Sequence, residues 1–170
     1  MSATAWGVTV DALLARMTGR SGYRSSWVEG VGRPVFDGVD IGLAEDQAGT
    51  LLVIAWPGDP DTPAEAGQSG QVVATLGTLR HRQEEGTVRC LAVDQRGDVG
   101  PGITAASRAA ALSVLDDVDA EVRADPTLGL QPAYQAVVAR IGGLPSIRGL
   151  LTERGVVTWV EFDVIFSVRI

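Results

Sequence analysis

Apolar and polar residues alternate most regularly in the last segment of the chain, from Val156 to Ile170. Every second position of this segment is apolar, except that Thr158 interrupts the series. The positions in between mix Val157, Trp159 and Ile165 with charged and polar residues. A period of two is typical of a strand that packs one face against a core. The segment predicts a long strand, and because it is long for a small domain, we expect it to continue into contact with another subunit.

Two segments carry apolar residues at the spacing of an α-helix. The first, Trp6 to Thr18, is short and is followed by Gly19, a residue type that commonly ends helices. The second, Ile103 to Ala124, is long, and Asp125-Pro126 ends it because the residue before a proline avoids helical geometry. Its apolar stripe consists of Ala111, Val114, Leu115, Val118 and Val122. We expect this stripe to pack against a sheet.

The middle of the chain contains three further runs with strand character. Leu51 to Trp56 is a compact apolar run between a glycine and a proline, which predicts a buried strand. Val72 to Arg82 and Thr87 to Gln95 predict two more strands, with Glu84-Glu85-Gly86 as the hairpin connection between them. Both faces of Thr87 to Gln95 are partly apolar, which is typical of an interior strand or of a strand covered on both sides.

The remaining segments complete a single-domain picture. Pro57 to Gly70 begins with three closely spaced prolines and predicts a proline-rich surface loop, long enough to suggest an interaction role. Ile147 to Thr152 predicts a strand, whereas Ala133 to Ile141 fits either a strand or a short helix. We therefore predict one α+β domain over residues 1–170. It would consist of a mostly antiparallel, mixed sheet packed against the long helix, with a short N-terminal helix.

Composition and charge narrow the functional classes. The 170 residues include 14 basic side chains, all arginine, and 21 acidic ones, for a net charge of −7. This acidic balance argues against a protein that binds nucleic acid by neutralising phosphates. The lack of lysine excludes a P-loop, and the joint lack of lysine and asparagine indicates a high-G+C genome. No window approaches the roughly 18 apolar residues of a membrane span, and the N-terminal residues lack the pattern of a secretory signal, so we expect synthesis in the cytoplasm.

The chain has one histidine, His81, and one cysteine, Cys90. These counts exclude an internal disulfide and a histidine-rich metal site. His81 lies between Arg80 and Arg82, whose charges disfavour a protonated imidazole, so we expect an exposed strand residue near a turn. Cys90 lies within an apolar run, and a buried, inert thiol is the expected state.

Two groups of acidic residues are candidates for a metal or acid–base site. Asp116 and Asp117 are adjacent on the predicted long helix and so point in different directions, with Asp119 nearby. A solvated helix face is the expected role of these three residues. Glu84-Glu85 predicts a charged turn rather than an acid–base pair.

Two loop segments are candidates for a ligand site. Asp59, Asp61 and Glu65 do not have the spacing of an EF-hand loop. Gly30 to Pro34 contains G-x-G but lacks the third glycine and the following helix of a dinucleotide-binding loop. We therefore predict no catalytic, cofactor-binding or metal-ligating residue, and a non-enzymatic protein that works through its surfaces.

The order of segments supplies a further clue. A short helix, a buried strand, a strand ending in Arg-Gly-Asp, an alanine-rich helix, the segment that this helix leads into and a terminal strand follow one another. These pieces are Val8 to Met17, Leu51 to Trp56, Thr87 to Asp98, Ala105 to Leu112, Val122 to Gly129 and Val156 to Ile170. In this order they resemble the tail terminator proteins of long-tailed, siphovirus-type bacteriophages, in the version found in phages of high-G+C hosts. The most specific piece is Arg123 to Gly129, and the match covers most of the chain after Leu51.

The resemblance implies a virion structural protein of the phage tail and neck, assembled in the host cytoplasm. It implies a homo-oligomeric ring, a hexamer, that caps the completed tail tube, stops its polymerisation and provides the surface for head–tail joining. The implied partners are further copies of the chain, the tail tube protein and the head–tail connector proteins, with no cofactor. A sheet with helices on its faces is the implied fold, in which Ala133 to Ile141 is a strand.

A ring needs two different patches that meet head to tail. The mixed face of Val156 to Ile170 and the loop Pro57 to Gly70 are the candidate patches. The arginines suit paired contacts with carboxylates across subunit interfaces, because their planar forks match carboxylate geometry. Acidic side chains are expected to line part of the lumen, so that genomic DNA passes through without specific binding.

Two other classes remain open on the sequence. One is a different neck or head–tail connector protein of the same particle, such as a head-completion or adaptor protein, which would also be small, acidic and non-enzymatic. The other is a small enzyme with a site assembled from acidic residues. Gene order separates the first class, and a metal-dependent shift in melting temperature tests for the second.

Overall fold

The computed structural model of the protein describes most of the chain. The described residues are 5–26, 28, 31–38, 48–59, 62–63, 67–76, 79–131, 133–152 and 155–169. Their helices and strands are α1 (Ala5–Gly19), β1 (Tyr23–Arg24), β2 (Arg33–Asp37), β3 (Gly49–Ile54), β4 (Gly58–Asp59), β5 (Thr62–Pro63), β6 (Gly67–Leu76), β7 (Leu79–Arg96), α2 (Ile103–Ala124), β8 (Gln135–Thr152) and β9 (Gly155–Arg169). The fold is α+β, as the sequence predicts.

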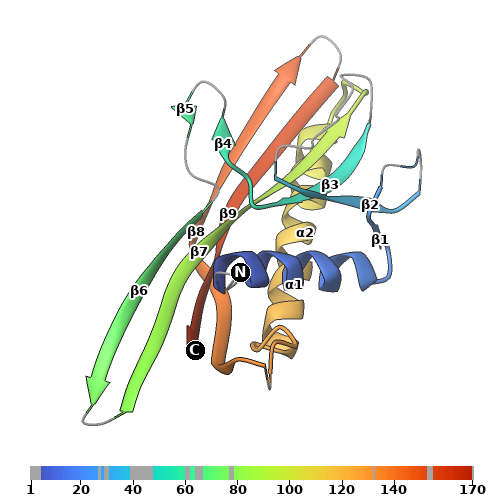
Figure 1. The fold of residues 1–170 in the computed structure, drawn as a ribbon. Coiled ribbons are helices and arrows are strands. Elements are labelled where there is room, and N and C mark those ends of the chain that lie inside the picture. Colours follow the sequence, from blue (N-terminus) through green and yellow to red (C-terminus); the bar gives the residue numbers. More distant parts are fainter. Residues whose placement is uncertain are drawn as a thin grey trace.

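The main sheet is mixed and has seven strands. Its order is β1-β2-β3-β7-β9-β8, with β6 paired to β7 on the same side as β3. The pairs β1–β2 and β2–β3 are parallel, and the other pairs of this sheet are antiparallel. β6 and the first residues of β7 continue past the end of β9 as a two-stranded hairpin, which projects from the body of the molecule (Figure 1).

The core lies between one face of this sheet and the two helices. α1 contributes Leu13 and Met17, which are 1% and 0% exposed, and α2 contributes its predicted apolar stripe. β9 presents its alternating residues to the helices: Val160, Phe162, Val164, Phe166 and Val168 are each at most 3% exposed. Burial of each such side chain stabilises the fold by roughly 1.5–3 kcal/mol. The period-two pattern of the terminal segment thus marks the face of β9 that the helices cover.

A smaller apolar cluster lies on the opposite face of the sheet. It consists of Leu51, Val53, Leu91 and Val93, with Trp56 and Trp159 among the partly buried side chains around it. β7 therefore has buried residues on both faces, and it pairs with strands on both edges. The prediction of an interior strand is confirmed.

Thr158, the polar interruption in the buried series of β9, has a partner on α2. The hydroxyl of Ser107 lies 2.9 Å from Oγ1 of Thr158 and 3.2 Å from the carbonyl oxygen of Asp94. Ser107 and Thr158 are both buried. Because buried hydroxyls are stable only when hydrogen-bonded, this contact explains how the series tolerates a threonine.

The predicted hairpin connection at Glu84-Glu85-Gly86 is wrong. β7 continues through these residues, and the β6–β7 hairpin turns between Leu76 and Leu79, which pair with each other. The predicted strand Val72 to Arg82 is therefore divided between β6 and β7. The physical reason lies in Glu84, which is 3% exposed and accepts a hydrogen bond from the backbone N–H of Ala5 at 3.1 Å. The local sequence predicts that the carboxylate of Glu84 faces solvent in a turn. The backbone N–H of Ala5, at the start of α1, instead provides a hydrogen bond that allows it to be buried.

The structure also corrects the predicted loop and decides the segment that periodicity left open. Part of the predicted loop Pro57 to Gly70 has strand structure, since β4 pairs with β5 and β6 already begins at Gly67. Ala133 to Ile141, which the periodicity left open, is largely strand. It joins the predicted strand Ile147 to Thr152 in one long β8, with register shifts against β9 near both ends of its first half.

Candidate interaction surface

β8 is the last strand in the order of the main sheet. It pairs with β9 on one side, and none of the described strands pairs with its other side. Such an edge presents backbone N–H and C=O groups that are available to another strand. The outer edge of β8 is therefore the place to look for a partner-binding surface.

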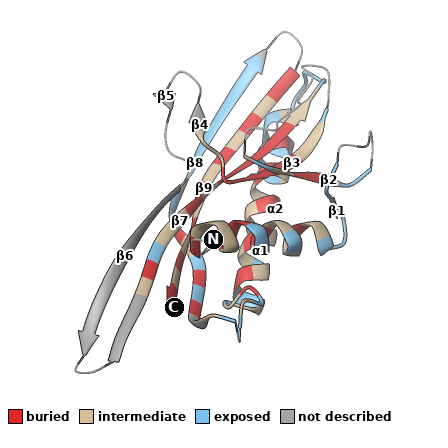
Figure 2. Cartoon of the chain, viewed as in Figure 1, coloured by how far each residue is buried: buried red, intermediate tan, exposed pale blue. Residues whose placement is uncertain are grey.

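Four large apolar side chains on the second half of β8 are exposed. Leu144 is 96% exposed, Leu151 69%, Leu150 51% and Ile147 46%. Figure 2 shows this half of β8 as a continuous exposed stretch, in contrast to the buried residues of β9 beside it. We call these four residues the β8 surface. Single exposed apolar residues are ordinary, but several together on an open strand edge mark an interaction site.

The β8 surface occupies both faces of the sheet. Ile147 and Leu151 pair with Val160 and Val156 of β9, so they lie on the side of the helices. Leu150 pairs with Val157 and lies on the opposite side. A strand added at this edge would therefore cover apolar side chains above and below it.

On the first half of β8, the residues that face the helices are covered, whereas the second half is exposed on both faces. Val137 and Ala139 are 2% and 3% exposed and belong to the core beneath the helices. Between the halves, the register shifts between Gly142 and Ser146. A Cβ at Gly142 would lie 2.2 Å from Cδ1 of Ile165, so a larger residue there would force the side chain of Ile165 to move.

A groove of about 580 Å³ lies between α2 and the first half of β8. Its lining is mostly apolar in area, with Leu115, Val122 and Ile141 among the contributors. Asp119 lines it as well and forms an ion pair with Arg123, whose Nε lies 2.7 Å from Oδ2 of the aspartate. None of the four residues of the β8 surface lines this groove.

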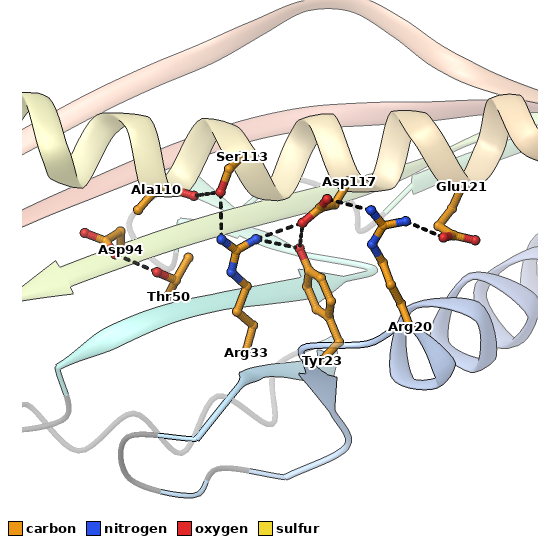
Figure 3. A network of polar contacts seen from close by, with 9 residues as sticks. All are labelled: Arg20, Tyr23, Arg33, Thr50, Asp94, Ala110, Ser113, Asp117 and Glu121. Atoms are coloured by element: carbon orange, nitrogen blue, oxygen red, sulfur yellow. Dashed lines mark hydrogen bonds and ion pairs between the residues drawn. The ribbon is translucent and has the colours of Figure 1, made fainter.

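The three aspartates of α2 are not brought together. Asp116 and Asp119 line the groove, whereas Asp117 points to the other side of the helix, towards α1 and β2 (Figure 3). Asp117 accepts hydrogen bonds from Arg20 at 2.8 Å, Arg33 at 2.8 Å and the hydroxyl of Tyr23 at 2.7 Å. The prediction that adjacent positions point apart is confirmed, but Asp117 is part of a polar network rather than a solvated face.

This network joins α1, the β1–β2 region and α2 (Figure 3). Arg20 also donates to Glu121, and Arg33 donates to Ser113 at 2.9 Å. Burial, followed by donation to Asp117, raises the pKa of Tyr23 to about 12, although Arg33 opposes the shift. The tyrosine is therefore neutral and acts as a hydrogen-bond donor at neutral pH.

The segment Arg123 to Gly129 contains the last two residues of α2 and a turn organised by Asp125. The carboxylate of Asp125 accepts hydrogen bonds from the backbone N–H of Thr127 at 2.9 Å and of Gly129 at 3.0 Å, and from the hydroxyl of Thr127. Arg16 of α1 forms an ion pair with the same carboxylate. The pKa of Asp125 is lowered, chiefly by the Thr127 hydroxyl. Arg16, Arg20 and Arg33 thus make their carboxylate contacts within one chain.

The single histidine and cysteine do not meet. Cys90 is buried in the core, as predicted, and burial raises the pKa of its thiol. His81 lies in β7 opposite Ala74, close to the hairpin turn. Glu84 and Glu85 are also part of β7, and Glu84 is held by α1 as described above.

The loop candidates are only partly described. Asp59 belongs to β4, and Asp61 and Glu65 lie outside the described residues. Within Gly30 to Pro34, Gly30 lies outside the described residues and Arg33-Pro34 begins β2.

Sequence reasoning missed Asp94, which is 2% exposed. Its carboxylate accepts hydrogen bonds from Thr50 at 2.7 Å and Arg96 at 2.8 Å (Figure 3 shows the Thr50 contact). One observation could have found it: Asp94 continues the alternating series Val88, Cys90, Ala92, which faces the helices. Asp94 of β7 pairs with Thr158 of β9. The polar residues that interrupt the buried apolar series of these two strands therefore lie side by side.

Among the described residues, no group of three or more histidine, cysteine, aspartate or glutamate side chains is placed to hold a metal ion. Neither α1 nor α2, the helices in the described part of the chain, is long and apolar enough to cross a membrane. Comparison with models of known protein families finds no match, and a search of curated proteins finds none either.

Proposed function

We propose that this protein is a tail terminator of a long-tailed bacteriophage, which forms a ring on the completed tail tube. The observation that carries the proposal is the β8 surface, an exposed apolar stretch on an open strand edge. Such a surface is costly to leave in water and is expected on a protein that functions as part of an assembly. The order of segments from the short helix to the terminal strand supplies the class of assembly.

The rest of the molecule supports a structural role. The arginine network holds α1, α2 and the β1–β2 region together. The body of the subunit that carries the open edge of β8 is therefore rigidly connected. The hairpin of β6 and β7 extends from the body of the subunit (Figure 1). A ring subunit needs two different contact patches that meet head to tail, and the hairpin and the β8 surface are two such patches. The net charge of −7 is in keeping with a lumen lined partly by acidic side chains, through which DNA would pass without binding.

The proposal is tested by combining the purified protein with growing tail tubes of the same phage. Light scattering and negative-stain images of the free and tube-bound protein should show rings of six subunits, and tube growth should stop at fixed length. Leu151→Lys should prevent both results, because it places a charge on the β8 surface. Val99→Lys is the matched control, since Val99 is also exposed, at 62%, but lies before α2.

The outcomes separate the candidate functions. A protein that stays monomeric in both conditions, on tubes that continue to grow, overturns the proposal. Rings that bind the head connector but do not stop tube growth indicate the alternative, another neck protein of the particle.

A further inference from the structure

We infer that β6 of one copy of this chain pairs with the outer edge of β8 of the next copy, along Ser146 to Thr152. The occupant of the β8 surface is thus a second copy of the chain, bound strand to strand. The inference deepens the proposed function, because it names the contact that closes the ring. Only the biological role of this contact rests on the proposed function. The pairing itself is a property of the purified protein.

The Ser146 to Thr152 edge lacks the features that normally keep strand edges apart. Natural edge strands are protected by charged side chains, prolines and bulges. On β8 these features come earlier: Pro145 and the register shift after Gly142 precede the segment. Within it, the one charged residue is Arg148, which already forms an ion pair with Glu161 of β9. The edge is therefore open to another strand.

β6 is the second open edge of the same sheet. It pairs with β7 along its whole length, from Gly67 opposite Val88 to Leu76 opposite Leu79. None of the described strands pairs with its other side. Its ten residues include no charged side chain and no proline, so it too lacks edge protection.

The two edges match in charge. β6 brings no charge to the contact, and the Ser146 to Thr152 segment brings one charge that is neutralised within its own chain. Pairing them buries apolar side chains on both faces of β8 without burying an unpaired charge, which would be costly. The ten residues of β6 are enough to span the segment.

The order of the sheet makes this contact intermolecular. Within one chain β7 and β9 lie between β6 and β8, so the two open edges belong to opposite sides of a four-stranded unit. Pairing one edge with the other therefore joins different copies head to tail. A repeated contact of this kind closes into a ring when the rotation between copies permits it.

Disulfide trapping tests the pairing. One preparation carries Leu150→Cys or Leu151→Cys, and a second, differently tagged preparation carries Val72→Cys, Val73→Cys or Ala74→Cys in β6. The two are mixed and mildly oxidised, both free and on tail tubes. The native Cys90 is buried and gives no background. We expect a disulfide between the two tagged forms for at least one pair of positions.

Other outcomes overturn the inference. Disulfides between two copies that both carry Leu150→Cys, without mixed products, indicate symmetric β8–β8 pairing. Val138→Cys, an exposed position on the first half of β8, is the matched control. Equal crosslinking there shows that the contact is not specific to Ser146 to Thr152. A lack of any crosslink in both conditions rules out edge pairing.

The result is independent of the test of function. Mixed disulfides on tubes that continue to grow would leave the pairing standing and reject the terminator role. Capped tubes without mixed disulfides would leave the role standing and reject the pairing.

Discussion

Asp117 illustrates how much the surroundings of one residue decide its role. Its position on the polar side of α2 indicates a solvated carboxylate, yet three donors from other parts of the chain meet it: Arg20, Tyr23 and Arg33. Hydrogen bonds to a charged acceptor are stronger than those between neutral groups. Asp117 therefore has a larger effect on stability than an ordinary surface residue.

Asp117→Asn should lower the pKa of Tyr23 from about 12, because it removes a negative charge and leaves Arg33, which favours the phenolate. Burial should still keep this pKa above the ordinary value. The variant should also lose about 2 kcal/mol of unfolding free energy. Rapid-mixing ultraviolet titration measures the pKa, with Tyr134→Phe in both proteins so that one tyrosine remains. An unchanged pKa would contradict the assigned contact.

Asp125 should make stability depend on pH in the acid range. Its folded-state pKa is lowered, so the ionised carboxylate stabilises the fold at neutral pH. This contribution is present above the unfolded-state pKa of about 4 and is lost as the pH falls through the folded-state value. Thr127→Val should raise the pKa of Asp125, because it removes the main stabilising donor.

Carboxyl carbon chemical shifts followed by NMR from neutral to acid pH measure this change. Thr104→Val, at an exposed position near the start of α2, is the control and should leave Asp125 unaffected. A raised pKa in both variants would show that the shift does not come from the Thr127 hydroxyl.

The strands β7 and β9 determine how the elements fit together. β7 pairs with β3 and β6 on one edge and with β9 on the other. The remaining strands of the main sheet are attached to it through β3 or β9. Its end lies very close to the start of β9. A Cβ at Gly155 would lie 1.8 Å from the carbonyl oxygen of Arg96, and Gly155 has a φ of 136°.

Gly155→Ala should therefore lower the unfolding free energy by about 3 kcal/mol, because it combines a backbone clash with a strained dihedral angle. Chemical denaturation measures the loss. Gly149→Ala in β8 is the control, since its nearest contact would be an ordinary 4.0 Å, and a change within about 0.5 kcal/mol is expected. Equal losses in the two variants would show that Arg96 does not limit the space at 155.

At the scale of the whole molecule, the core is well packed, but β6 and β8 of the main sheet each pair with a described strand on one side alone. The helices cover one face over the core, while β6 and the second half of β8 leave edges without a described partner. If these edges pair between copies, folding and association are linked. Anything that binds only the folded state raises the melting temperature by mass action.

The melting temperature should accordingly rise with protein concentration. Leu151→Lys should make it independent of concentration, and Val99→Lys should retain the dependence. Differential scanning calorimetry over a hundredfold concentration range measures this. A melting temperature that does not vary with concentration in the unmodified protein would contradict association through β8.

The sequence by itself determined the elements whose pattern is local. The two helices, the buried face of β9 and the buried state of Cys90 follow from period and composition, because an apolar face must be covered wherever the chain folds. The terminator role remains a proposal, since the order of segments supports it without testing it.

Only the tertiary structure decided the features that depend on distant contacts. β7 continues through Glu84 because the N–H of Ala5, 79 residues away, satisfies the carboxylate. Asp117 is the centre of a hydrogen-bond network because Arg20, which follows α1, and Arg33 of β2 both donate to it. The second half of β8 is exposed on both faces, whereas the residues of its first half that face the helices are covered. Local patterns show which positions are apolar or charged, but the path of the rest of the chain determines which of them are covered.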